Sequence, residues 1–188
     1  MSEQVFDVLI VGGGMAGTTA AMFLQRGGLK TVVFDKRESR LVDVSRVNNY
    51  PGFPEGLPGT ELLALSRKQA ERFGAVVKDE RAEELKVLAD GSFAARGESG
   101  TTFRAPRVLI ASNKNTKAAT DLGLTLTGFK GKFIHHDGKG RTPLKNAYVC
   151  GRITEIPSQA VIAAGDGAAV AITMITDLRG EYYIDHDD

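Results

Sequence analysis

The stretch VFDVLIVGGGMAGTTAAMFLQRGGLKTVVFD, residues 5–35, decides the fold. It begins with an almost unbroken apolar run over 5–11, which is typical of a strand buried on both faces of a parallel sheet. Glycines follow at once, and after them we expect a helix from Met15 to Arg26 and a second strand over 31–34. This order of strand, glycine loop, helix and strand predicts an α/β domain with a central parallel sheet and flanking helices.

Three glycines in the loop have separate expected roles in binding a dinucleotide. Gly12 permits the tight turn, Gly14 lets the backbone approach a pyrophosphate, and Gly17 lets the helix pack on the strand. Met15 and Ala16 begin the helix, whose free N–H groups and positive dipole end attract an anion. The loop therefore predicts a Rossmann-like FAD/NAD(P)-binding domain, the alternative being a structural turn that binds no ligand.

Asp35 ends the second strand, about twenty residues after the glycines, where a carboxylate can accept hydrogen bonds from ribose hydroxyls. A carboxylate there disfavours a 2′-phosphate, so we expect FAD or NAD(H) rather than NADP(H). Lys36 or Arg37 could then lie over the adenine or pair with a phosphate. The alternative is that these charges belong to a solvated loop.

Composition narrows the classes of protein to which the chain can belong. The 188 residues are enough for one domain, and the formal net charge of +1 favours neither nucleic acid nor an anionic membrane as a partner. We find no apolar run long enough for a bilayer and no signal peptide at the start, so we expect a cytoplasmic protein. Cys150 is the only cysteine, and the adjacent His135 and His136 would point to opposite faces of a strand, so we expect neither a disulfide nor a metal site.

The rest of the chain predicts further parallel strands, helices and one antiparallel insertion. Short alternating segments with glycine turns between Glu83 and Phe103 predict a small β-meander crossover in place of a helix. Thr60 is the expected N-cap of the helix that follows the loop over 46–54. The other expected elements are a helix over 60–73, strands over 75–77 and 107–111, a loop with a short helix over 112–130, strands over 132–136 and 146–151, and a helix over 158–177.

These motifs resemble the FAD domain of the low-molecular-weight thioredoxin reductase family over nearly the whole chain. Residues 47–53, Val-Asn-Asn-Tyr-Pro-Gly-Phe, are similar to the family's Val-Glu-Asn-Tyr-Pro-Gly-Phe loop, which implies that Asn49 approaches the flavin ring. The helix beginning at Ser158 is similar to the family's final helix, which implies that Gln159 and Ala160 lie beside the ring. The FAD-binding residues that we expect are Gly12, Gly14, Met15, Ala16, Gly17, Asp35, Lys36, Asn49, Val77, Ala111, Gly151, Arg152, Gln159 and Ala160.

The chain also departs from the family at the point where the family carries a second domain. The family inserts an NADPH-binding domain with a C-x-x-C dithiol between the strands that correspond to Ala111 and Phe133. In this chain residues 115–131 stand there instead, and Ser112 and Asn113 replace the family's Thr-Gly. The resemblance thus implies a single FAD-binding domain over 1–188, without a pyridine-nucleotide site or a dithiol.

A second departure lies at Arg152, where the family has an aspartate that binds the ribityl chain of the flavin. An arginine cannot accept that hydrogen bond, but it could pair with the pyrophosphate.

Two functions remain open from the sequence. The first is an FAD-dependent oxidoreductase or electron-transfer protein that works with free NAD(P)H or with a separate redox partner protein. The alternative is a non-catalytic sensor or regulatory module that binds FAD or another adenine dinucleotide. The resemblance implies a homodimer. We identify no catalytic residue, because a lone cysteine such as Cys150 at the end of a buried strand is typical of a core position.

Overall fold

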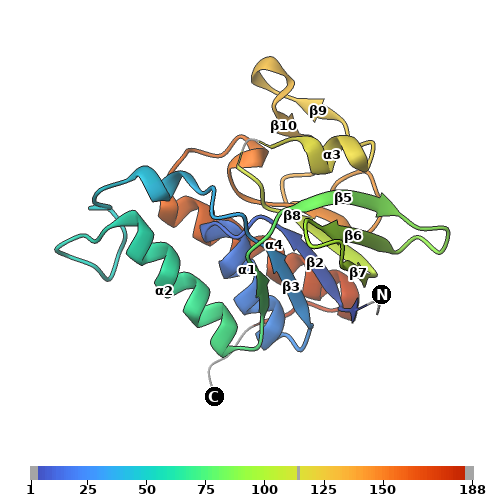
Figure 1. Ribbon diagram of the computed structural model, residues 1–188, viewed down its shortest axis with the longest axis horizontal. Helices are drawn as coiled ribbons and strands as arrows, with labels where there is room; N and C mark the ends of the chain where they lie inside the picture. The colour runs from blue at the N-terminus through green and yellow to red at the C-terminus, as the bar shows by residue number, and fades with distance from the viewer. Residues whose placement is uncertain (1–3, 114, 185–188) are drawn as a thin grey trace.

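A five-stranded parallel sheet forms the centre of the molecule (Figure 1). The computed structural model describes residues 4–113 and 115–184. The sheet has the strand order β11-β8-β2-β3-β4, so the glycine loop follows the central strand. These strands are β2 (Val8–Val11), β3 (Thr31–Phe34), β4 (Val76–Lys78), β8 (Arg107–Ile110) and β11 (Ala147–Val149). The predicted α/β class with a central parallel sheet is confirmed.

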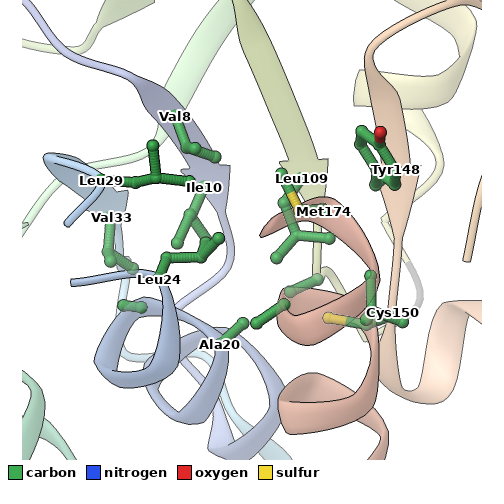
Figure 2. Packing of buried hydrophobic residues seen from close by; sticks show 14 of the residues in the cluster. Val8, Ile10, Ala20, Leu24, Leu29, Val33, Leu109, Tyr148, Cys150 and Met174 are labelled. Atoms are coloured by element: carbon green, nitrogen blue, oxygen red, sulfur yellow. The ribbon is translucent and has the colours of Figure 1, made fainter. Parts of the chain in front are cut away.

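Helices α1 (Met15–Arg26) and α4 (Ala160–Arg179) pack on one face of this sheet. Val8 and Ile10 point to that face, and Leu9 between them points to the other, because successive side chains alternate along a strand. Figure 2 shows Leu24 of α1 and Met174 of α4 on the helical side of the strands. Helix α1 has the bounds that the sequence predicts.

A second, four-stranded sheet covers the opposite face of the parallel sheet. It contains the predicted β-meander as antiparallel strands β5 (Ala82–Val87), β6 (Phe93–Gly97) and β7 (Thr102–Ala105), joined by β1 (Gln4–Val5), which pairs with β7 in parallel. Phe93 and Phe103 of the meander are fully enclosed against the parallel sheet. Three layers therefore enclose a hydrophobic core on each face of the parallel sheet.

The single strand predicted over 5–11 is wrong at its start. The chain leaves β1 at Val5, bends at Asp7 and enters β2 at Val8, so the apolar run is shared between two sheets. The Asp7 carboxylate accepts a hydrogen bond from the Lys30 N–H at 2.8 Å, which fixes the bend. Val5 is 71% exposed, whereas the first three residues of β2 are completely buried.

The connecting segments are of the types that the sequence predicts, but the start of one helix differs. Helix α2 begins at Gly59, with Pro58 as its N-cap, so the prediction that Thr60 caps this helix is wrong. The proline can start the helix because its fixed φ suits the turn before it. The remaining elements are α2 (Gly59–Arg72), α3 (Lys117–Asp121), β9 (Leu126–Thr127), β10 (Phe133–Ile134) and the 3₁₀ turns η1 (Arg40–Asp43), η2 (Phe129–Gly131) and η3 (Gly151–Thr154).

Helix α4 corrects the expectation that no apolar segment is long enough for a bilayer. Over an 18-residue window its mean hydropathy is 1.5, which by length and composition alone would let it cross a membrane. In the structure its buried side, which includes Val170 and Met174, packs on α1 and the sheet. A core helix of a globular domain passes the same test of length and hydropathy.

Candidate cofactor-binding site

Two cavities meet above the glycine loop and form one groove. Their volumes are about 390 and about 420 Å³, and both are lined by Gly14, Ser39, Ala111 and Asn113. The groove lies where the central strands β2, β3 and β8 end, which is where open α/β sheets bind their ligands. We call the larger cavity, which reaches Asp35, the Asp35 end, and the smaller one, which reaches Gln159, the Gln159 end.

The backbone around the glycine loop is packed too closely for side chains at two of the expected glycines. Gly12 has φ +114°, and a Cβ there would lie 2.7 Å from the carbonyl oxygen of Ala111. A Cβ at Gly17 would lie 1.9 Å from the carbonyl oxygen of Gly12. These two glycines thus bring helix α1 close to the ends of β2 and β8.

Gly14 is different, because the protein itself leaves space beside it. Among the described residues, a Cβ at Gly14 would approach only Ser39, whose Oγ is 3.6 Å away, an ordinary contact distance. Gly14 is also the N-cap of α1, and none of the side chains that the structure describes caps that helix start. Free N–H groups beside an open backbone surface fit a ligand with an anionic group such as a pyrophosphate.

Gly13 has a role that sequence reasoning missed. A Cβ at Gly13 would lie 2.3 Å from the Cβ of Asp35, so the Asp35 side chain rests directly against the loop backbone. Three consecutive glycines were the available signal, but only the folded chain shows which atoms face the middle one. Gly13 therefore helps to place the carboxylate that we expect at the ribose.

At the Asp35 end, ion pairs hold the segment after β3. The Asp35 Oδ1 accepts a hydrogen bond from the Arg37 N–H at 2.8 Å. Lys36 forms an ion pair with Glu98 of the meander, so its ammonium is already partnered in this structure. Asp35 and Lys36 both line the groove.

At the Gln159 end, two distant parts of the chain meet. The Asn49 Nδ2 donates a hydrogen bond to the Gln159 Oε1 at 2.9 Å, although 110 positions separate the two residues. Gln159 is the N-cap of α4, and it lines the groove together with Met15 and Ala160. The residues expected beside the flavin ring from the resemblance are thus brought together.

Arg152 lines the same end of the groove and has an unmet hydrogen-bonding group. Its guanidinium carbon lies 4.9 Å from the centre of the Phe133 ring. Its Nη1 is buried and has no hydrogen-bond partner within the part of the chain that the structure describes. A buried donor without an acceptor is costly, so this nitrogen fits a ligand that brings an acceptor oxygen. The open surface at Gly14 and this unpaired donor show that the residues present fit FAD.

Gly151, just before Arg152, packs against helix α1 and does not itself line either cavity of the groove. It has φ +78°, and a Cβ there would lie 2.8 Å from the Cβ of Ala16. Its N–H donates to the Asp166 Oδ2 at 2.6 Å. Asp166 is a second residue that sequence reasoning missed, and no spacing rule relates it to Gly151.

Val77 and Cys150 lie away from the groove. Val77 packs against the core between the sheet and α1 and does not line either cavity. Cys150 is completely buried, and this burial raises the pKa of its thiol well above its ordinary value. Thiolate chemistry at Cys150 is therefore disfavoured in the folded protein.

Comparisons with known proteins agree with FAD as the cofactor. A family profile described as "FAD binding domain" matches residues 7–45, which contain the glycine loop and Asp35. The NADPH-dependent thioredoxin reductase 3 of Arabidopsis thaliana is 42% identical over 165 residues, covering 77% of this chain and 31% of that protein. The thioredoxin reductase of Helicobacter pylori is 30% identical over 187 residues, covering 97% of this chain and 56% of that protein. The chain thus spans between 31% and 56% of these relatives' lengths.

Solved structures show the same fold. A thioredoxin reductase structure from Gloeobacter violaceus matches with a TM-score of 0.84 and 18% sequence identity, covering 99% of this chain and 99% of that chain. Because that identity is low, this likeness supports the fold, while the sequence matches support the lineage. Together with the glycine loop and its open groove, these findings identify the chain as a thioredoxin reductase-like FAD-binding domain.

Proposed function

We propose that this chain is an FAD-dependent oxidoreductase domain that exchanges electrons with a separate donor and acceptor. The observation that carries the proposal is the groove lined by Asp35, Gly14 and Gln159, with Asn49 hydrogen-bonded to Gln159 beside it. A groove that runs from Asp35 past Gly14 to Gln159 suits an extended dinucleotide with its adenosine at one end and its flavin at the other.

The chain's own groups bind and orient the cofactor. FAD supplies reversible uptake and release of electrons when it is bound. The start of α1 and the open backbone at Gly14 favour its phosphates, and the Arg152 Nη1 offers a further donor. The Asn49–Gln159 hydrogen bond fixes two polar side chains at the far end, which limits the ring positions that the site accepts.

A separate electron partner is part of the proposal because Cys150 is the only cysteine in the sequence and lies in the core. A dithiol of the C-x-x-C type therefore cannot form within this chain. The relative from Arabidopsis thaliana is named as NADPH-dependent, which supports free NAD(P)H as one candidate donor. A redox partner protein is the other candidate. We also propose that the domain forms a homodimer, on the resemblance to its family.

Anaerobic reduction of the FAD-loaded protein tests the proposal. The flavin absorbance should bleach with NADH, NADPH or a reduced electron-carrier protein, and should return when an oxidised acceptor is added. Dithionite reduction provides the control that the flavin is intact. A protein that holds FAD, bleaches with dithionite and is inert to each of the other donors would instead support the non-catalytic FAD module.

A further inference from the structure

The segment after β3 is tied to its surroundings through three consecutive residues. Each of them forms an ion pair with the β4–β5 connection or with the β6–β7 turn, and the pairs are Lys36–Glu98, Arg37–Asp79 and Glu38–Arg81. Single exposed ion pairs contribute little to stability, but several that hold one short segment can fix its geometry. The middle pair is the one connected to Asp35.

Arg37 makes that connection with its backbone and its side chain at once. Its N–H donates to the Asp35 Oδ1 at 2.8 Å, while its Nε and Nη2 donate to the two carboxylate oxygens of Asp79 at 3.0 and 3.2 Å. Its φ is +58°, in the left-handed region that non-glycine residues seldom adopt. An arginine in that conformation needs contacts that hold it, and the paired hydrogen bonds to Asp79 provide them.

Asp79 is itself anchored by helix α2. Arg67 of α2 donates to both carboxylate oxygens of Asp79, with a distance of 3.3 Å from its Nη2, and its Nε donates to Glu71 at 2.9 Å. The side chain of Arg67 is only 21% exposed, compared with 69% for Arg37. A chain of hydrogen bonds thus runs from the less exposed Arg67 through Asp79 and Arg37 to Asp35.

We propose that Arg37 is a positioning residue for the adenosine end of FAD, and that Asp79 anchors it. Asp35 is held between the backbone of Gly13 on one side and the Arg37 N–H on the other. A carboxylate held in one orientation before the ligand arrives loses less freedom on binding, so it binds the ribose hydroxyls more tightly. This inference rests on FAD binding in the groove with its ribose at Asp35.

The pairing with Asp79 also explains why an arginine can follow Asp35 in a site that accepts a free ribose. An arginine near this position can bind the 2′-phosphate of NADP. Here the Nε and Nη2 of the Arg37 guanidinium, the edge that faces Asp79, both donate to its carboxylate. Arg37 therefore acts on the ribose through Asp35 rather than as a phosphate ligand.

The test compares ligands that contain different parts of FAD. Dissociation constants for FAD, 5′-ADP and FMN are measured on the apoprotein of the wild type, Arg37→Gln, Arg67→Gln and Arg37→Gly. Arg96→Gln is the matched control, because Arg96 is an exposed arginine beside Glu83 and Glu84 that does not line the groove. We expect Arg37→Gln to raise the dissociation constants for FAD and 5′-ADP by about three- to tenfold and to leave that for FMN unchanged.

Two further variants separate the backbone from the side chain. Both substitutions at Arg37 keep the N–H, but glycine favours the positive φ that glutamine disfavours, so Arg37→Gly should lose less FAD affinity than Arg37→Gln. Arg67→Gln should weaken FAD and 5′-ADP binding less than Arg37→Gln, because Arg37 still holds Asp79.

The possible results have distinct meanings. Unchanged FAD and 5′-ADP affinity in Arg37→Gln overturns the positioning role, and so does an equal loss of FMN affinity, which would indicate a general loosening of the fold. A wild-type protein that binds neither FAD nor 5′-ADP would contradict the cofactor site itself and this inference with it.

Discussion

Asp79 shows how a single side chain at the rim of the site depends on its neighbours. Hydrogen bonds from Arg67 and then Arg37 lower the pKa of the Asp79 carboxyl to about 2. Its side chain is half exposed, so solvent screens these interactions and their net contribution to stability is modest. The lowered pKa nevertheless makes that contribution depend on pH in a defined direction.

We expect Asp79→Asn to destabilise the protein at neutral pH and to do so less as the pH falls. A carboxyl whose pKa is lowered by folding stabilises the native state above its unfolded pKa near 4. That stabilisation disappears as the pH falls toward the folded pKa of about 2. Urea unfolding of the wild type and Asp79→Asn at several pH values between about 6 and 3 measures the difference.

The same comparison in an Arg37→Gln/Arg67→Gln background is the control. Without the two arginines, Asp79→Asn should have little effect at any pH. A stability difference in the otherwise wild-type protein that is as large at pH 3 as at pH 6 would show that these arginines do not lower the pKa of Asp79.

Among the elements, α4 packs against α1 through a small residue. A Cβ at Gly167 would lie 2.2 Å from the carbonyl oxygen of Ala16 in α1, so the two helices approach closely at this point. Gly165 lies on the exposed side of the same helix, and a Cβ there would meet no atom of residues 4–113 and 115–184 within 4 Å. The two glycines thus offer a matched pair for testing how α4 packs.

Alanine at these two positions should have opposite effects. Gly167→Ala forces α1 and α4 apart and should lower the free energy of unfolding by about 1–3 kcal/mol. Gly165→Ala should raise it by roughly 0.5–1 kcal/mol, because alanine favours the helix and nothing opposes its methyl group. Thermal and urea unfolding measure both variants, and equal effects at the two positions would mean that the packing of α4 on α1 is misplaced.

The sequence predicts the elements well where one local pattern has one explanation. Helix α1 starts right after Gly14 and ends before Gly27, and its bounds follow from the sequence alone. The strand at 5–11 could not be divided in advance, because the apolar residues on both sides of Asp7 serve two different sheets. Thr60 has the chemistry of an N-cap, but the position of Pro58 in the folded chain decides where α2 begins.

At the scale of the whole molecule, the groove is assembled from segments that no local pattern connects. The glycine loop and Asp35 lie within one supersecondary unit, so spacing alone predicts that they share a site. Asn49 and Gln159 come from opposite halves of the chain, and only the resemblance to a known family suggested that they meet. The roles of Gly13, Asp166 and Arg37 required coordinates, because they depend on which atoms face each residue after folding.

Gly14 offers the most direct test of the central claim, which is that FAD lies in this groove with its pyrophosphate over the loop. The φ of Gly14 is −74°, and the protein leaves room for a Cβ. Gly14→Val should therefore fold, with a free energy of unfolding that is lower by about 1 kcal/mol or less. The valine side chain would occupy the surface that the pyrophosphate needs.

The measurement is a titration of the apoprotein with FAD, followed by flavin absorbance and fluorescence, for the wild type and Gly14→Val. The wild type should bind one FAD per chain and show the visible spectrum of a bound flavin. Gly14→Val should give the circular dichroism spectrum of a folded protein but bind no FAD. A wild-type protein that takes up no FAD, or a folded Gly14→Val that binds FAD as tightly as the wild type, would contradict the account.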